Sequence, residues 1–221
     1  MKRKFKISMN GKIYIIGIGP GSEEYLTKKA IDTVGISDYT VGSGRAVDLF
    51  ENAPGKIVFN VKDLTDKLKK GVELAADGNT VSILSTGDPG FSGVLNTVLR
   101  ICREKGFPED NVEVIPGISS LQLAAGRCHI QWDNANVMTF HGRENINTIL
   151  PVINNGKITI ALPSRKVKDM ARFLLDNGVS KDRMVTVCER LSYPDEKIVT
   201  TTLNEIADSE FTYMCIIIIY P

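Results

Sequence analysis

Three loops rich in glycine and small polar residues hold the groups best suited to binding a small ligand. Apolar, β-branched runs at 13–16, 81–84 and 112–115 lead into GIGPG (17–21), STGDPG (85–90) and PGISS (116–120). Loops without bulky side chains expose backbone N–H and C=O groups, and such loops lie at the carboxyl edge of α/β sheets. Ser85, Thr86 and Asp88 add polar side chains to the second loop. We therefore expect these loops to bind something small.

Each loop also has an explanation without a ligand, because glycine, aspartate and proline are common in tight turns. GIGPG lacks the third glycine of the dinucleotide-binding fingerprint, although Asp38 lies about where a ribose-binding acid would be expected. In STGDPG, a type I turn built on Asp88 and Pro89 would be sufficient. A nucleotide-binding module without catalytic activity is therefore one open interpretation.

The elements that carry these loops alternate between short β-branched runs and helical spacing, which predicts an α/β protein. We expect a first α/β domain at 12–116 and a second at 117–221, without a long flexible linker. The first domain should have helices after an N-cap at Ser22, between 64 and 75, and at 91–105. Its strands are expected at 12–16, 39–41, 56–59, 80–84 and 112–115.

The second domain has fewer helices between its apolar runs and ends in a long β-branched segment. Ser164 is expected to cap a helix that Gly178 stops. The strands of this domain are expected at 137–140, 158–162, 184–188, 198–201 and 213–220.

Charge and hydropathy restrict the partners of the protein. The 27 Lys and Arg nearly balance the 26 Asp and Glu, which leaves a formal net charge of +1. Any anionic ligand must then be bound by individual arginines, because no overall field attracts nucleic acid. The longest apolar stretch, 215–220, is too short to cross a bilayer, and residues 1–11 lack the apolar segment of a signal peptide. We expect a cytoplasmic protein without nucleic-acid or membrane partners.

The residues that commonly bind metals are scattered. Four cysteines occur without a CxxC pair, and neither histidine has a Cys or His neighbour at a ligand spacing. We therefore expect reduced, mostly packed thiols and no protein-bound metal. These residues are Cys102, Cys128, Cys188, Cys215, His129 and His141.

Six segments occur together in a fixed order, and their combination is far more specific than any one glycine loop. They are GIGPG, VGSGRAVDLF (41–50), STGDPGFSG (85–93), EVIPGISSLQLAAGR (113–127), FHGR (140–143) and VCERLSYPDEKI (187–198). With these segments the chain resembles the tetrapyrrole methylase family from about Lys12 to its end. Within that family it is most similar to the subgroup that methylates C5 of cobalt-precorrin-7, or precorrin-7, in cobalamin biosynthesis.

The resemblance implies two α/β domains of the tetrapyrrole methylase type with a cofactor cleft between them, and a homodimer. It implies S-adenosylmethionine as the methyl donor and S-adenosylhomocysteine as the product. Asp88 could instead stabilise its own turn, and Ser120 could simply cap a helix. The residues that the resemblance implies for donor binding are Gly87, Asp88, Phe91, Ser119, Ser120, Leu162 and Cys188. Of these, Leu162 and Cys188 would pack against the adenine ring.

The resemblance also implies a corrin precursor as acceptor, whose acetate and propionate groups suit arginine. Arg45 and Arg143 match family motif positions, and Gly19 and Pro20 are expected on the substrate side. His141 could remove a proton from the acceptor or hold a carboxylate. Some relatives carry a fused enzyme that methylates C15 and decarboxylates a side chain; we expect that step to belong to a separate protein.

Two departures from the subgroup concern the acceptor side and the helix before Trp132. Relatives commonly have a second glycine and an additional basic residue in the turn where this chain has Ser43 and Gly44, and a basic or polar residue in place of Ala46. Cys128 and His129 stand where relatives are more apolar. The presence of cobalt in the substrate stays open. A methylase of the same fold acting on another tetrapyrrole carbon, on RNA or on a protein is the alternative, and the near-zero net charge speaks against RNA.

Overall fold

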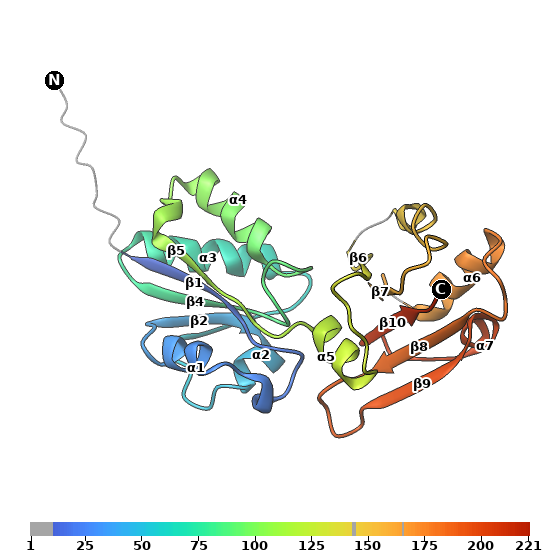
Figure 1. Cartoon of the computed structure of the whole chain (residues 1–221). Helices are drawn as coiled ribbons and strands as arrows, with labels where there is room; N and C mark the ends of the chain where they lie inside the picture. Colours follow the sequence, from blue (N-terminus) through green and yellow to red (C-terminus); the bar gives the residue numbers. More distant parts are fainter. Residues whose placement is uncertain (1–10, 143–144, 165) are drawn as a thin grey trace. The chain divides into compact units, whose positions relative to one another are not determined.

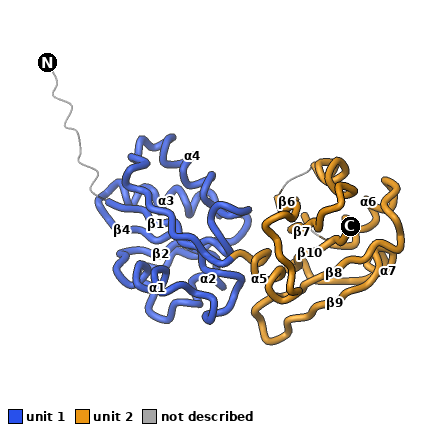
Figure 2. Tube along the Cα trace, in the orientation of Figure 1, with its two compact units in different colours: residues 1–118 blue, residues 119–221 orange. Residues whose placement is uncertain are grey.

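The chain forms two compact units, each with its own sheet and hydrophobic core. The structure is a computed structural model that describes residues 11–142, 145–164 and 166–221 (Figure 1). The first unit ends at Ile118, and the second runs from Ser119 to Pro221 (Figure 2). This division lies two residues after the boundary that the sequence predicts. The predicted α/β class is confirmed.

The first unit is built on a parallel sheet. Among its described residues, five strands pair in the order β3-β2-β4-β1-β5. β1 is an interior strand between β4 and β5, and Ile13, Ile15 and Ile16 are fully buried because helices cover both faces of the sheet. All carboxyl ends therefore share one edge of the sheet. The strands are β1 (Lys12–Gly17), β2 (Tyr39–Ser43), β3 (Lys56–Phe59), β4 (Thr80–Ser85) and β5 (Val112–Ile115).

Two helices cover each face of this sheet (Figure 1). Apolar residues at helical spacing, such as Leu68 and Val72, pack against one face, and Ala30 and Val34 pack against the other. The first face carries α3 (Leu64–Ala76) and α4 (Leu95–Lys105), and the second carries α1 (Lys28–Gly35) and α2 (Gly44–Asp48). A 3-10 turn, η2 (Glu109–Asn111), follows α4.

Two helix starts in this unit differ from expectation. Thr27, not Ser22, caps α1, and its side chain accepts a hydrogen bond from Ala30 N at 3.1 Å. Ser22 instead precedes the 3-10 turn η1 (Glu23–Tyr25) and makes no side-chain cap. Helix α4 begins at Leu95 rather than Phe91, because the preceding segment includes Ser92 with a φ of 58° and cannot be helical.

The second unit has a mixed sheet. Among its described residues, five strands pair in the order β6-β7-β10-β8-β9; β6 and β7 are parallel, and the other pairs are antiparallel. All five lie close to predicted runs. They are β6 (Asn136–Thr139), β7 (Thr159–Leu162), β8 (Met184–Glu189), β9 (Lys197–Thr202) and β10 (Cys215–Ile219).

Helices pack on both faces of the second sheet. The main core lies on one face, where Met170 and Leu174 of α6 (Val167–Asp176) and Leu203 and Ile206 of α7 (Leu203–Asp208) pack on the strands. α5 (Ser120–Arg127) contacts β7 and β10, and a 3-10 turn, η3 (Ile146–Ile149), follows β6. The prediction that Ser164 caps α6 was wrong. The N-cap is Lys166, two residues further on, and it makes no side-chain cap.

Candidate cofactor and substrate site

Three backbone segments converge at the carboxyl edge of the first sheet, where β4, β1 and β5 end side by side. A Cβ atom added to Gly17 would lie 2.4 Å from the backbone N of Gly117 and 2.7 Å from the carbonyl O of Gly87. One added to Gly117 would lie 2.4 Å from the same oxygen of Gly87. Real Cβ atoms essentially never come so close, so only glycine fits at Gly17 and Gly117. The three predicted loops therefore meet as bare backbone; we call them the loop cluster (17–21, 85–90 and 116–118).

A short antiparallel bridge joins the first two loops of this cluster. Gly87 N donates to Gly19 O at 2.7 Å, and Ile18 N donates to Ser85 O at 3.0 Å. Gly19 and Gly87 have φ values of 75° and 69°, which side-chain-bearing residues rarely adopt. The next residue, Pro20, is buried. The structure thus places Gly19 and Pro20, expected on the substrate side, in the same cluster as Gly87.

Asp88 connects the second loop of the cluster to the third. Its Oδ1 accepts a hydrogen bond from Gly90 N at 2.8 Å, and its Oδ2 accepts one from Gly117 N at 3.2 Å. The turn-stabilising role that the sequence left open is therefore present, and a second bond to another loop accompanies it. Phe91, whose N–H donates to Asp88 O at 3.3 Å, is partly exposed beside this turn.

The loop cluster suits the methyl donor that the sequence predicts. The amino-acid end of S-adenosylmethionine carries an ammonium and a carboxylate, which bind carboxylate or carbonyl oxygens and N–H groups, respectively. Thr86 is exposed, and Gly87 and Asp88 are partly exposed, so the second loop presents a hydroxyl, backbone groups and a carboxylate to solvent. The absence of a side chain at Gly87 lets a ligand approach the backbone closely.

The predicted donor serines stand at the start of α5 in the second unit. Ser119 is the N-cap, and its Oγ accepts a hydrogen bond from Leu121 N at 3.3 Å. The side chain of Gln122 accepts one from Ser119 N at 2.8 Å, which completes a capping box. Ser120 is the first helical residue, so the simple capping role considered for Ser120 belongs to its neighbour.

Leu162 and Cys188 lie on the same face of the second sheet. Cys188 pairs with Ile216 of β10, and the register of β7 with β10 brings Leu162 opposite the same residue. Residues paired across strands point to the same side. The adjacent residues of the three strands, Ala161, Val187 and Ile217, point to the other face and belong to the main core. Leu162 and Cys188 therefore lie on the face opposite the main core. Leu162 is partly exposed, whereas Cys188 is fully buried and its sulfur contacts that of Cys128 at 3.7 Å.

His141 follows the carboxyl end of β6, at the edge where β7 and β8 also end. It is exposed, and its backbone N–H donates to Thr139 Oγ1 at 3.3 Å. The predicted acceptor-binding residue Arg143 lies outside the described residues. In the first unit, exposed Arg45 lies in α2 directly after β2, at the same sheet edge as the loop cluster.

The position of Asp38 argues against the dinucleotide interpretation. A ribose-binding acid lies at the carboxyl edge of its sheet, but Asp38 precedes β2 and lies at the amino edge. Its Oδ2 accepts a hydrogen bond from Thr80 N at 2.8 Å, and its own N–H donates to Thr80 O at 2.8 Å. The spacing expectation was therefore wrong, and Asp38 stabilises the start of two strands.

A polar cluster that the sequence did not reveal fixes the loop after β8. Glu196 accepts hydrogen bonds from Arg127 Nε of α5 at 2.8 Å and from Ser192 N at 2.8 Å. Burial alone would raise the pKa of Glu196, but these two bonds outweigh it and lower the pKa below its ordinary value. The cluster therefore ties the end of α5 to the loop after β8. Arg127 and Glu196 are 69 residues apart, so no local spacing could have indicated their contact.

The neighbouring residues of this loop have their own partners. Arg190, with a φ of 50°, pairs with Asp195 at 2.6 Å and lies 4.7 Å from the ring centre of Tyr193. Glu189 accepts a hydrogen bond from Thr212 N. Glu189 and Arg190, although adjacent in the sequence, therefore bind separate partners within the second unit.

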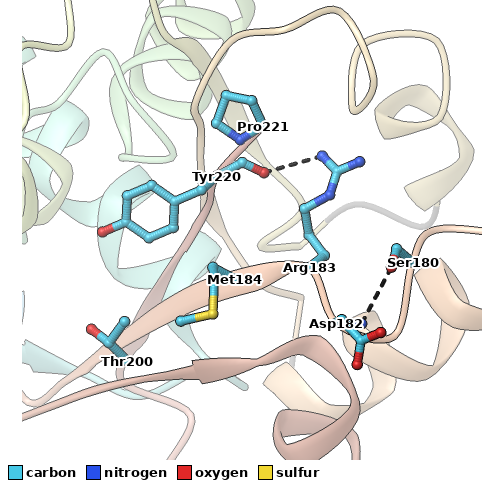
Figure 3. Close-up of a pocket in the computed structure, with 7 residues that line it drawn as sticks. All are labelled: Ser180, Asp182, Arg183, Met184, Thr200, Tyr220 and Pro221. Atoms are coloured by element: carbon cyan, nitrogen blue, oxygen red, sulfur yellow. Dashed lines mark hydrogen bonds between the residues drawn. The ribbon is translucent and has the colours of Figure 1, made fainter.

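A hollow of about 590 Å³ lies at the amino end of β8 (Figure 3). Met184 and Thr200 line it, whereas Cys188 lies near the opposite end of β8. Arg183, which also lines it, donates to Ile153 O at 3.3 Å, Tyr220 O at 3.1 Å and Asn154 Oδ1 at 2.8 Å. Because Arg183 already binds these oxygens of its own chain, we do not assign the hollow to the donor or the acceptor.

Two further expectations concern metals and membranes. Within residues 11–142, 145–164 and 166–221, no group of three or more His, Cys, Asp or Glu residues could hold a metal ion. The expectation of a metal-free protein stays a prediction. No helix in the same described ranges is long and apolar enough to span a bilayer.

Comparison with known proteins supports the family resemblance that the sequence motifs indicate. Residues 12–207 match the profile of the family described as Tetrapyrrole (Corrin/Porphyrin) Methylases. A probable cobalt-precorrin-7 C(5)-methyltransferase of Methanocaldococcus jannaschii is 42% identical over 206 residues, covering 92% of this chain and 95% of the relative.

Solved structures share the fold. A uroporphyrin-III C-methyl transferase of Thermus thermophilus, complexed with S-adenosylhomocysteine, aligns with a TM-score of 0.77 and 23% identity, over 95% of this chain and 97% of the other. The precorrin-6Y methylase of Archaeoglobus fulgidus aligns with a TM-score of 0.69 and 22% identity, over 95% of this chain and 97% of the other. At these identities the alignments support the architecture alone.

Proposed function

Since the chain belongs to the tetrapyrrole (corrin/porphyrin) methylase family, we propose that it methylates C5 of cobalt-precorrin-7, or of its cobalt-free form, in cobalamin biosynthesis. The observation that carries this proposal is the 42% identity to a probable C5-methyltransferase over nearly the full length of both chains. The methyl donor is S-adenosylmethionine.

The proposal assigns donor binding to two groups of residues, one in each unit. In the first unit, Gly87, Asp88 and Phe91 would hold the amino-acid end of the donor, supported by the exposure of the second loop and its fixed carboxylate. In the second unit, the residues at the start of α5 and at the ends of β7 and β8 would complete the site. These are Ser119, Ser120, Leu162 and Cys188.

When bound, S-adenosylmethionine supplies an activated methyl group on a positively charged sulfur. The residues of the chain then need to orient the two reactants, which contributes about 7–11 kcal/mol where reacting groups are well aligned. Backbone groups held by the Gly19–Gly87 bridge suit this task, because they cannot rotate away as a long side chain can. Neither a covalent intermediate nor a metal is required for this transfer.

The acceptor is a corrin with several carboxylates, for which guanidinium groups are the best matched side chains. We assign this role to Arg45 and Arg143, with Gly19 and Pro20 close to the acceptor side. His141, exposed at the end of β6, is the candidate to take a proton or to hold a carboxylate. We also propose that the enzyme is a cytoplasmic homodimer, and that a separate enzyme methylates C15.

Incubation with methyl-labelled S-adenosylmethionine and cobalt-precorrin-7 tests the proposal. Mass spectrometry should show one added methyl group, and NMR should place it at C5. A methyl group at another corrin carbon would refute the subgroup assignment and leave the family intact. Transfer to RNA or to a protein, with no corrinoid product, would refute the acceptor class.

A further inference from the structure

Two cysteines that are distant in the sequence lie in contact in the second unit. The sulfurs of Cys128 and Cys188 are 3.7 Å apart, although 60 residues separate them. Cys128 is the C-cap of α5, and Cys188 is the second-last residue of β8. Neither lies in a CxxC pattern, so only the packing of α5 near the end of β8 brings the thiols together.

The backbone around Cys128 is held in place on both sides. After it, His129 has a φ of 54° at a position where helices usually place glycine. The N–H of Ile130 donates to Ala125 O at 2.8 Å and closes the helix end. Before it, Arg127 is tied to Glu196 in the loop that follows β8. The end of α5, and Cys128 with it, is therefore fixed against the strand that carries Cys188.

The two thiols differ in accessibility. Cys128 is partly exposed, whereas Cys188 is fully buried, and burial raises the pKa of the Cys188 thiol. Cys215 is paired with Glu189 rather than Cys188, so it points to the opposite face of the sheet, where its Sγ donates to Thr212 O at 2.8 Å. An oxidant therefore reaches Cys128 first, and Cys188 is the sulfur beside it.

We propose that Cys128 and Cys188 form an oxidisable dithiol whose disulfide weakens binding of the methyl donor. The effect on the donor rests on the proposed function, because Cys188 and Leu162 are assigned to the adenine end of the donor site. A disulfide requires an S–S distance of about 2.05 Å, so the sulfurs must move together from 3.7 Å. We expect that movement to shift the side chain of Cys188, which lies on the same face of the sheet as Leu162.

A peroxide is the oxidant class that this step needs. The sulfur of Cys128 attacks one peroxide oxygen, which breaks the O–O bond and gives a sulfenic acid and one molecule of water or alcohol. The sulfur of Cys188 then attacks the sulfenic sulfur, and the hydroxide that leaves takes the Cys188 proton as water. Two thiols are oxidised to one disulfide, and one peroxide is reduced. A dithiol reductant reverses the change.

Peptide mapping tests the bond itself. The fully reduced protein is treated with hydrogen peroxide, remaining thiols are blocked, and the digest is analysed by mass spectrometry without reduction. We expect a peptide pair joined through Cys128 and Cys188, lighter by two hydrogen atoms, in the wild type and in Cys102→Ser. Cys128→Ser should yield no such pair. A Cys188–Cys215 pair, or Cys128 oxidised only to sulfinic acid, would overturn the proposal.

Calorimetry with S-adenosylhomocysteine tests the consequence. We expect the oxidised wild type to bind at least tenfold more weakly than the reduced form, dithiothreitol to restore binding, and Cys128→Ser to be unaffected by peroxide. Equal affinity of the oxidised and reduced forms for S-adenosylhomocysteine would refute the proposed effect of the disulfide on donor binding. If the reduced protein does not bind S-adenosylhomocysteine but the joined peptides form, the proposed function fails and the dithiol stands.

Discussion

The carboxylate of Asp88 accepts a hydrogen bond from the backbone N–H of Gly117, at 3.2 Å, and so joins the loop after β4 to the loop after β5. The two residues are 29 positions apart, and β1 lies between their strands. Asp88 was expected to bind the donor or to stabilise its own turn. The structure adds a third role, which is to hold two loops of the cluster together.

Replacing Asp88 should therefore affect both stability and donor binding. Asp88→Ala removes two hydrogen bonds from backbone N–H groups to a carboxylate, and we expect a loss of about 2 kcal/mol in the free energy of unfolding. S-adenosylhomocysteine should bind at least tenfold more weakly, measured by calorimetry. Exposed Asp110 provides a matched control, since Asp110→Ala should change neither quantity. Unchanged affinity in Asp88→Ala would remove Asp88 from the donor site.

Replacement by alanine should lower the unfolding free energy at Gly117 and raise it at Gly126. The added methyl group in Gly117→Ala would meet backbone atoms of Gly87 and Gly17, so we expect a loss of about 1–3 kcal/mol in unfolding free energy. Gly126 is exposed in α5 with no atom within 4 Å of an added Cβ, and alanine there should stabilise by about 0.5–1 kcal/mol. Urea denaturation measures both. A neutral Gly117→Ala would show that the loops do not touch.

Of the two serines assigned to the donor site at the start of α5, only Ser119 also caps the helix, so their substitutions should differ in stability. Ser119→Ala removes the N-cap and should cost about 1 kcal/mol of stability. Ser120→Ala should leave stability unchanged and weaken S-adenosylhomocysteine binding about fivefold, the value of one lost hydrogen bond. Thr202→Ala, which removes the cap of α7, is the control for cap loss alone. If Ser120→Ala binds normally, Ser120 does not contact the donor.

Glu196 should make stability depend on acid pH. Its pKa is lowered in the folded state, so its contribution is complete above the unfolded value, near 4.5, and is lost as the pH falls through the folded value. Glu196→Gln should therefore cost about 1 kcal/mol at neutral pH. The difference from the wild type should disappear as the pH is lowered through the carboxyl range. Urea denaturation over a pH series checks this, and a difference that persists in acid would contradict it.

The two arginines assigned to the acceptor should act on it alone. Arg45→Ala and Arg143→Ala should each raise the KM for the corrin about tenfold, because a carboxylate loses a paired guanidinium. The affinity for S-adenosylhomocysteine should stay within twofold of the wild type. Arg100→Ala, on the exposed side of α4, is the surface-charge control. Equal losses in donor affinity and corrin KM would contradict the division of roles.

Much of the fold was predictable because it depends on local patterns. The interior strand β1 and the short strands β3 and β5 match the apolar runs that predicted them. Helix starts were less predictable: α1 begins after Thr27 and α4 after the turn at Ser92, because a cap depends on backbone angles and not on residue type alone. The contacts of Cys128 with Cys188 and of Glu196 with Arg127 were not predicted, because the partners lie far apart in the sequence.

The sequence by itself determined which strands end in small, polar loops, and its ordered motifs were sufficient to identify the family. Only the tertiary structure decided that Gly17, Gly87 and Gly117 meet, that Asp38 lies at the opposite edge of the sheet, and that Cys128 contacts Cys188. The reason is physical. Apolar periodicity specifies which faces are buried, whereas the order in which strands pair depends on how the connecting helices pack across the sheet.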